Sequence, residues 1–259
     1  MNDAVTMHVE PRLQDSALLF AFEGWNDAGE SATSALEFVN EAIRAAPLAD
    51  IDPEEFYDFT VSRPEVAVSP DHRRSICWPS NTFRFGPVSE SRELVTCLGV
   101  EPHLRWRSFC DCMVEVASRV GVHQIVMLGS YLADVVYSQP VQVTGFASRP
   151  EVLEDLGVSA SSYQGPTGIV GVLADRLERE GFEVVSLWAG LPHYINIRPN
   201  PRGALALVRK LVRCLDLKLD EESLSARAIE FEGRISRLVA GDPELEDYVK
   251  QLKRREFAL

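Results

Sequence analysis

The chain has 259 residues, of which 46% are hydrophobic and 25% charged, so it can bury a large core in one α/β domain or in a domain with an appendage. Its formal net charge of −13 argues against binding to the phosphate backbone of nucleic acids, because proteins that do so usually display a basic face. No apolar run reaches the about 18 residues of a membrane span, and the N-terminus lacks the pattern of a signal peptide, which predicts a cytoplasmic protein without nucleic-acid or membrane partners.

The first predicted strand is followed by a turn and a helix. Residues 16–22 form a short apolar run typical of a buried parallel strand. After the turn, apolar residues recur at helical spacing as far as Ile43. Asp27 and Glu30 have the spacing of a capping box, which favours a helix that starts just after residue 27.

The alternation of strands and helices continues along the chain, with one interruption. Residues 54–61 and 92–100 are predicted strands, and a β-hairpin is predicted at 72–87. The remaining predicted strands are 123–130, 139–147 and 182–190, and the remaining predicted helices follow residue 105 and span 165–181 and 201–215. This order predicts an α/β fold, a three-layer αβα core whose mostly parallel sheet is covered on both faces.

The last forty residues have a different pattern. Their apolar residues recur in steps of four and three, which is typical of amphipathic helices. Between two such stretches, Gly241, Asp242 and Pro243 supply a helix stop, a cap and a first helical residue. The sequence therefore predicts a core domain at 1–215 that carries the hairpin, and a C-terminal helical lid at 216–259.

Each strong strand ends on polar, glycine or aromatic residues. The carboxyl ends of parallel strands lie on one edge of a sheet, where ligands bind. A loop that opens the helix at 165–181 adds backbone amides that face an anion at this edge. The predicted ligand-binding set is Trp25, Asn26, Asp27, Glu101, Ser130, Gly165, Thr167, Gly168 and His193.

Structural alternatives exist for these residues. Asp27 fits a helix cap as well as an acid or base, and Trp25 fits a core anchor with one wet edge. Ser130, Asp134 and His193 are the candidates for nucleophilic catalysis, but the sequence around Ser130 is not the strained G-x-S-x-G turn that exposes a nucleophile. His193 equally fits a structural role.

The sequence predicts neither a metal site nor a cofactor. Cys110 and Cys112 are two residues apart on a predicted helix, so their side chains diverge by about 200°. The five cysteines are an odd number without a disulfide framework, which favours reduced thiols. Gly165, Gly168 and Gly171 miss the order of a dinucleotide-binding loop.

Four segments, "GWNDAGESA", "GVEPHLRW", "YQGPTGIVGVLADRLEREGF" and "SLWAGLPHYI", occur in this order along the chain. Together they resemble the proteasome assembly chaperone 2 family in its bacterial, actinobacterial-type form, over roughly residues 15–215 and with a similar helical tail. The resemblance implies an αβα core like that of nucleoside phosphorylases and related hydrolases. It also implies a hairpin used in oligomer contacts, a homotrimer, and a helical region over the cleft.

The resemblance further implies a role in protein assembly, because eukaryotic relatives help to assemble proteasome α-rings. Archaeal relatives dock on proteasomes through a C-terminal hydrophobic-Tyr-any motif, from which Phe257-Ala258-Leu259 departs. Three hypotheses follow: a non-catalytic assembly module with a ligand-competent cleft, a small-molecule enzyme of the phosphorylase or hydrolase type, and a structural oligomer. The expected partners are a second copy of the chain, another protein or an anionic small molecule. An enzyme should place His193 within hydrogen-bond reach of Ser130, Asp134, Asp27 or Glu101.

Overall fold

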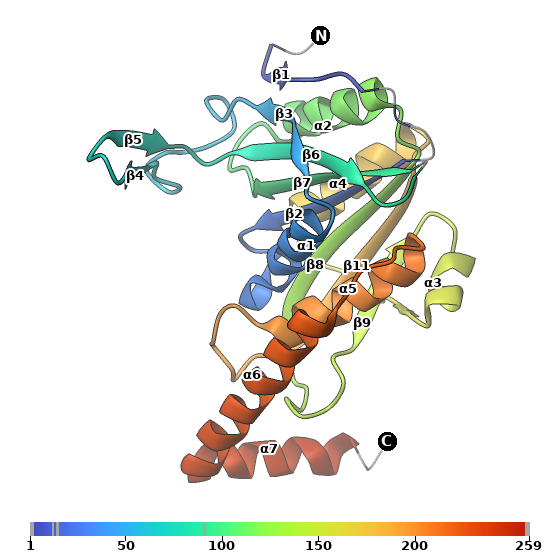
Figure 1. The fold of residues 1–259 in the computed structure, drawn as a ribbon. Helices are drawn as coiled ribbons and strands as arrows, with labels where there is room; N and C mark the ends of the chain where they lie inside the picture. The colour runs from blue at the N-terminus through green and yellow to red at the C-terminus, as the bar shows by residue number, and fades with distance from the viewer. Residues whose placement is uncertain (1–2, 12, 14–15, 91, 257–259) are drawn as a thin grey trace.

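A computed structural model describes residues 3–11, 13, 16–90 and 92–256 of the chain. A mixed sheet lies between two helical layers, and a long helical tail extends from one end (Figure 1). In spatial order the described strands of this sheet are β1 (Val5–Met7), β3 (Ala46–Ile51), β6 (Asn81–Pro87), β7 (Glu93–Val100), β2 (Ala17–Glu23), β8 (Gln124–Ala133), β11 (Glu183–Pro192), β9 (Val143–Ala147) and β10 (Ser159–Ala160). The predicted αβα core is confirmed.

The centre of the sheet is parallel and its flanks are mostly antiparallel. Strands β7, β2, β8 and β11 run in one direction, whereas β3, β6 and β9 pair antiparallel with their inner neighbours. Every residue of β2 from Ala17 to Phe22 is buried, as expected for a parallel strand covered on both faces. The apolar runs singled out in the sequence are therefore the central strands.

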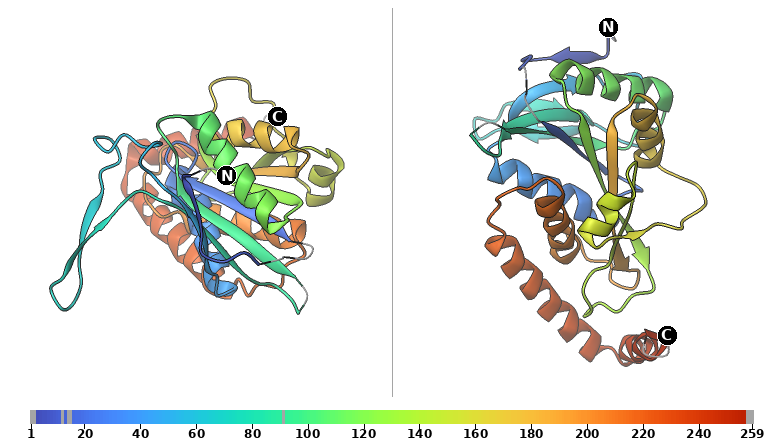
Figure 2. Two further views of the ribbon diagram at one scale, coloured as in Figure 1. Left: turned by 90° about the horizontal axis from the view of Figure 1, so that it is seen from above. Right: turned by 90° about the vertical axis from the view of Figure 1, so that its right-hand side faces the viewer.

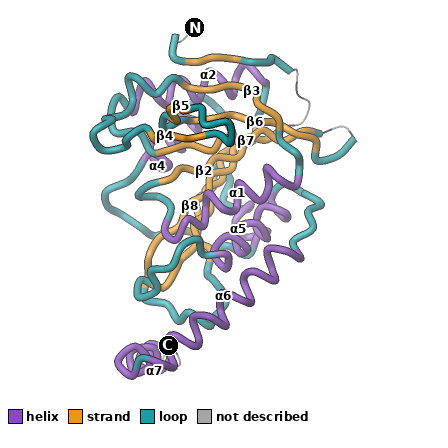
Figure 3. The backbone as a smooth tube through the Cα atoms, turned by 60° about the vertical axis from the view of Figure 1, so that its left-hand side comes forward, coloured by secondary structure: helices purple, strands orange, loops and turns teal. Residues whose placement is uncertain are grey.

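Two pairs of helices cover the sheet (Figures 2 and 3). Helices α1 (Ser31–Ala42) and α5 (Pro201–Cys214) cover one face, α2 (Trp106–Val120) and α4 (Ile169–Arg179) cover the other, and the short α3 (Glu151–Leu156) lies beside β9. Alternate residues of β2 serve the two faces: Leu19 packs with α1 and α5, and Phe20 with α2 and α4. Each face therefore has its own apolar core.

The isolated hairpin consists of β4 (Glu65–Val68) and β5 (Arg74–Cys77), and the prediction of a hairpin at 72–87 was wrong in its bounds. Strand β6 lies in the main sheet between β3 and β7. The reason is burial: Phe83 on β6 is fully buried with its ring edge-on to Phe20 at 6.2 Å, whereas every residue of β4 and β5 is exposed. The hairpin projects from the body of the molecule (Figures 1 and 2).

The strand predicted at 54–61 was also wrong, because these residues form turns and a loop. Phe56 and Tyr57 are buried, and the Tyr57 hydroxyl donates a hydrogen bond to the Val100 carbonyl oxygen at 2.6 Å. The apolar side chains of this segment therefore anchor a loop to the core. The strand of this region is β3, whose short sequence "APLADI" carries little strand signal.

The tail consists of α6 (Glu222–Gly241) and α7 (Pro243–Glu256), as predicted. The first half of α6 packs on α5 through Leu224 and Ala228. The second half joins α7 and residues beyond the ends of β8 and β11 in a separate apolar cluster, which includes Val136, Phe231, Ile235, Val239, Val249 and Leu252. In the described residues, no helix is both long and apolar enough to cross a membrane. The boundary between core and tail at residues 215 and 216 stays a prediction.

Candidate functional site

Glu101 directly follows β7 and joins three segments that are far apart in the sequence. Its Oε1 accepts hydrogen bonds from the side-chain amide of Asn26 at 2.9 Å and from the backbone amide of Ile169 at 2.8 Å. Its Oε2 accepts a longer hydrogen bond, 3.4 Å, from the backbone amide of Trp25. Ile169 is the first residue of α4, so Glu101 caps this helix from another strand, where the helix dipole favours a carboxylate.

The anion position predicted at the start of α4 is thus held by a carboxylate of the protein itself. Gly168 is the N-cap residue, and a Cβ at this position would lie 2.6 Å from Glu101 Oε1 and closer still to Asn26 Oδ1. Only glycine therefore allows the backbone to approach these two side chains. Gly165 and Thr167 lie in the exposed loop that leads into α4, and the side chain of Thr167 does not cap the helix.

Asn26 is fully buried, and one of its polar atoms remains unused. Its backbone carbonyl accepts a hydrogen bond from the Ser130 amide at 2.8 Å, and its Nδ2 donates to Glu101. Within the described part of the chain, its Oδ1 has no hydrogen-bond partner. Asn26 is therefore a predicted site residue with bonding capacity to spare.

Asp27 is buried and caps α1. Its Oδ1 accepts hydrogen bonds from the backbone amides of Ala32 at 2.7 Å and Thr33 at 3.4 Å, and the Thr33 hydroxyl donates to the other oxygen. Burial raises the pKa of Asp27, although these hydrogen bonds act in the opposite direction. The geometry supports the cap alternative, but the predicted capping box is absent because a turn of 3₁₀ helix, η1 (Ala28–Glu30), precedes α1.

Ser130 lies within β8 and is tied to the same turn. Its hydroxyl donates a hydrogen bond to the Ala28 carbonyl oxygen at 2.8 Å and lies 3.4 Å from Asp27 Oδ1. The hydroxyl thus fastens the turn after β2 to the neighbouring strand. This is a structural use of the residue.

Trp25 is 63% exposed, which argues against the alternative that it anchors the core. Tyr163, in the loop before α4, is 65% exposed. Trp188 differs, because it is half-buried and its Nε1 donates a hydrogen bond to the Ser186 hydroxyl at 2.8 Å. Large aromatic side chains left in solvent are typical of interaction surfaces.

His193 and Asp134 form a second cluster beside the tail. The Nδ1 atom of His193 lies 3.0 Å from Asp134 Oδ1, and the Tyr248 hydroxyl lies 3.4 Å from the same oxygen. The rings of His193, Tyr194 and Tyr248 pack edge to face with centroids 5.4 to 5.7 Å apart. Sequence reasoning missed Tyr248, because nothing in the α7 pattern indicates which strand end the helix will cover.

The structure does not assemble the predicted serine, histidine and carboxylate. The His193 amide donates to the Ala133 carbonyl oxygen, three residues beyond Ser130 on β8. At about 3.3 Å per residue, this places His193 roughly 10 Å along the sheet from Ser130. Of the four partners expected of an enzyme, Asp134 lies within hydrogen-bond reach of His193 among the described residues, so this contact is present, but it does not include Ser130.

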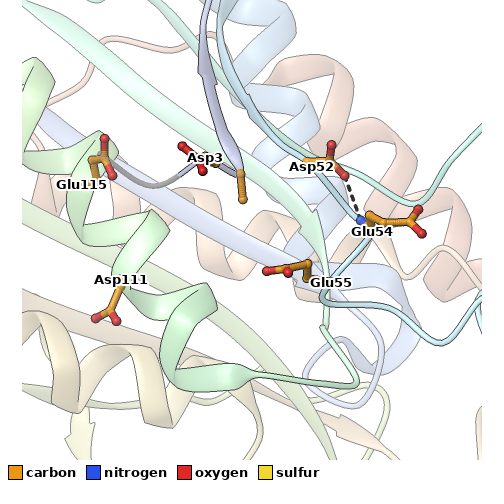
Figure 4. Close-up of a pocket in the computed structure, with 7 residues that line it drawn as sticks. Asp3, Asp52, Glu54, Glu55, Asp111 and Glu115 are labelled. Carbon is orange, nitrogen blue, oxygen red and sulfur yellow. Dashed lines mark hydrogen bonds between the residues drawn. The ribbon is translucent and has the colours of Figure 1, made fainter.

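An open cavity of about 690 Å³ lies beside α2, away from the predicted site (Figure 4). The acidic residues that line it are Asp3, Asp52, Glu54, Glu55, Asp111 and Glu115. Three of them form ion pairs with arginines: Glu55 with Arg105, Glu115 with Arg119, and Asp111 with Arg176. In the part of the chain that is described, no group of His, Cys, Asp and Glu side chains has the arrangement to hold a metal ion.

Known proteins resemble this chain in sequence and in fold. The sequence profile of the PAC2 family matches residues 21–239. The crystal structure of a PAC2 family protein from Streptomyces avermitilis is 35% identical with a TM-score of 0.83, over 91% of this chain and 100% of that one. A proteasome-assembly chaperone homologue from Mycobacterium tuberculosis is 36% identical with a TM-score of 0.82, over 90% of this chain and 99% of that one.

A curated relative matches over a shorter stretch. It is an uncharacterised protein from Methanocaldococcus jannaschii, 27% identical over 130 residues, which are 49% of this chain and 52% of the relative. The chain therefore spans about half the length of the curated relative that it matches. Because the family profile covers most of the chain and two solved structures of the fold exceed 30% identity, the chain belongs to the PAC2 family.

Proposed function

We propose that this protein is a non-catalytic assembly module that binds other protein chains, including copies of itself. The observation that carries the proposal is the β4–β5 hairpin, where Val66, Val68 and Ile76, together with Trp78 directly after β5, are 48 to 60% exposed. A two-stranded sheet without a core of its own is marginal in water. Apolar side chains gathered on such a sheet are best explained by burial against a partner.

The relatives and the carboxyl edge support the same function. The Mycobacterium tuberculosis relative is described as a proteasome-assembly chaperone homologue, and assembly requires surfaces that bind protein. At the edge, the carboxylates of Asp27 and Glu101 cap helices, and Ser130 fastens a turn. These contacts favour assembly over the enzymatic alternative.

We propose that the hairpin mediates self-association and that the edge around Trp25 binds a partner or a ligand. A trimer is the assembly that the family resemblance implies. A hairpin that inserts into a different surface of the next copy makes a head-to-tail contact, and such contacts close into rings when the rotation fits. The exposed Trp25 and the half-buried Glu101 then remain as the second surface.

The oligomeric state of the full chain tests the hairpin. Sedimentation velocity and light scattering at micromolar concentration should give a homo-oligomer, expected to be a trimer. The double variant Ile76→Ser, Trp78→Ser should shift the mass to that of a monomer. The matched control is Ile229→Ser, because Ile229 on α6 is 72% exposed and lies outside the hairpin. A monomeric unmodified chain, or an unchanged mass for the double variant, would contradict the proposal.

A further inference from the structure

A cavity of about 180 Å³ lies where the segment after β8 meets the end of β11 and the start of α5. It contrasts with the acidic cavity beside α2. Among the described residues that line it there is no aspartate or glutamate, although the chain has 39 of them, and the one charged residue there is Arg202. The cavity therefore presents a single cation in a strongly acidic protein.

The guanidinium of Arg202 is largely buried and incompletely paired. Its side chain is 15% exposed, its Nε lies 3.3 Å from Glu232 Oε2, and its Nη2 donates to the Gln139 carbonyl oxygen at 2.7 Å. A guanidinium has five N–H groups, so these contacts leave donors to spare. Burial lowers the pKa of Arg202 despite the proximity of Glu232, which indicates that the buried charge is only partly compensated.

The size and walls of the cavity define what fits. A volume of about 180 Å³ exceeds the about 30 Å³ of one water and is below the ~300–1,000 Å³ of pockets for drug-sized ligands. Val135, Val141 and Pro192 supply apolar walls, and Tyr137 and Gln142 add polar atoms. A guanidinium binds a planar carboxylate through two parallel hydrogen bonds.

We propose that this cavity binds a small organic carboxylate with a short aliphatic chain. Its carboxylate lies on the guanidinium of Arg202, and its chain lies against Val135, Val141 and Pro192. The site is separate from the predicted set at Trp25 and Glu101, none of whose residues lines the cavity.

The same geometry links the ligand to the tail. Glu232 belongs to α6 and pairs with Arg202 through Nε, so a carboxylate on the remaining donors places a second negative charge beside Glu232 and repels it. The hydroxyl of Tyr137, which also lines the cavity, lies 3.3 Å from the Ser236 hydroxyl of α6. Binding therefore weakens one of the contacts that hold the tail to the core.

Isothermal titration of the full chain with sodium butyrate tests the site, with butanamide as the uncharged isostere and sodium chloride at equal ionic strength. Butyrate should bind, and butanamide should bind at least about tenfold more weakly, because a charged hydrogen-bond partner is lost. Equal binding of both compounds would overturn the proposal. Tighter binding of inorganic phosphate than of butyrate would also overturn it, because the apolar walls would then play no part.

Two variants should move the affinity in opposite directions. Arg202→Met should weaken butyrate binding at least about tenfold, whereas Glu232→Gln, which removes the repelling charge, should strengthen it several-fold. Glu232 is 40% exposed, so the second variant tests the site even where Arg202→Met does not fold. Arg209→Met is the matched control, because Arg209 is an exposed residue of α5 that pairs with Glu221 at 2.9 Å. An absence of heat with both the unmodified chain and Glu232→Gln at millimolar butyrate would refute the site.

Discussion

The carboxyl edge of the sheet and the β4–β5 hairpin both carry conspicuous side chains, and the fold treats them in opposite ways. At the edge, Asp27, Glu101 and Ser130 are buried or half-buried, and each bonds to backbone groups of the protein itself. In the hairpin Ile76 is about half exposed, as is Trp78 directly after it, whose ring packs edge-on to that of Phe59 at 4.8 Å. The monomer therefore supplies hydrogen-bond partners for the polar residues of the edge, whereas it leaves the apolar residues of the hairpin exposed.

This difference distinguishes residues that stabilise the monomer from residues that are available to bind a partner. A buried polar group must find a hydrogen-bond partner, and the edge supplies one in each helix cap. An apolar residue in solvent contributes nothing to the stability of the monomer, because it removes no apolar area from water. The comparison predicts that substitutions at the edge unfold the chain more readily than substitutions in the hairpin.

The largest loss of stability is expected for a substitution in the apolar core of the domain. Phe109 is fully buried, with its ring 5.4 Å from that of Phe56 and 6.1 Å from that of Phe22. Phe109→Ala should lower the free energy of unfolding by about 3–5 kcal/mol in urea titrations. Ile76→Ala should change it by less than about 0.5 kcal/mol. A comparable loss for both variants would show that the hairpin belongs to the core.

Glu101→Gln should have the next largest effect. The amide keeps the shape of the side chain but removes the charge that caps α4, which should cost about 1–3 kcal/mol of unfolding free energy. Glu178→Gln, an exposed position near the other end of α4, is the control and should stay within about 0.5 kcal/mol. If the two variants unfold at the same urea concentration, Glu101 does not cap the helix.

A pH-dependent effect is expected for Asp27. Because burial raises its pKa above 3.8, the folded state takes up the proton first, and the stability tied to this group falls as pH rises from about 3.8 through the raised pKa. The stability advantage of the unmodified chain over Asp27→Asn should therefore shrink over this range in pH-resolved thermal unfolding.

Asp58→Asn is the control of opposite sign. Hydrogen bonds from Thr60 lower the pKa of Asp58, so the stability from this carboxylate is present above pH 3.8 and lost as pH falls through the lowered pKa. The advantage of the unmodified chain over Asp58→Asn should grow with pH. If both advantages change with pH in the same direction, burial does not raise the pKa of Asp27.

The smallest change in stability is expected for Trp25→Ala. Its side chain is 63% exposed, so the free energy of unfolding should change by less than about 0.5 kcal/mol, far below the value for a buried aromatic. Chemical unfolding of the purified variant measures this. A loss of about 3 kcal/mol in the free energy of unfolding would show that Trp25 packs in the core and stabilises the monomer.

The sequence by itself determined the main elements of this fold. The buried run of β2, the helical spacing of α1 and the two helices of the tail are periodic patterns of neighbouring residues. Such patterns reflect which face of an element is buried, and this information is local. The convergence of Asn26, Glu101 and Gly168 also followed from the sequence, because parallel strands end at one edge.

Only the tertiary structure decided which groups pair. Residues 81–87 form a strand of the main sheet because Phe83 packs against Phe20 there. Residues 54–61 were mistaken for a strand because Phe56 is apolar, but its ring packs against Phe109 from a loop. Glu101 caps a helix that begins 68 residues later. Hydrogen-bond and packing partners at such separations are selected by the free energy of the whole fold. A short stretch of sequence therefore does not indicate them.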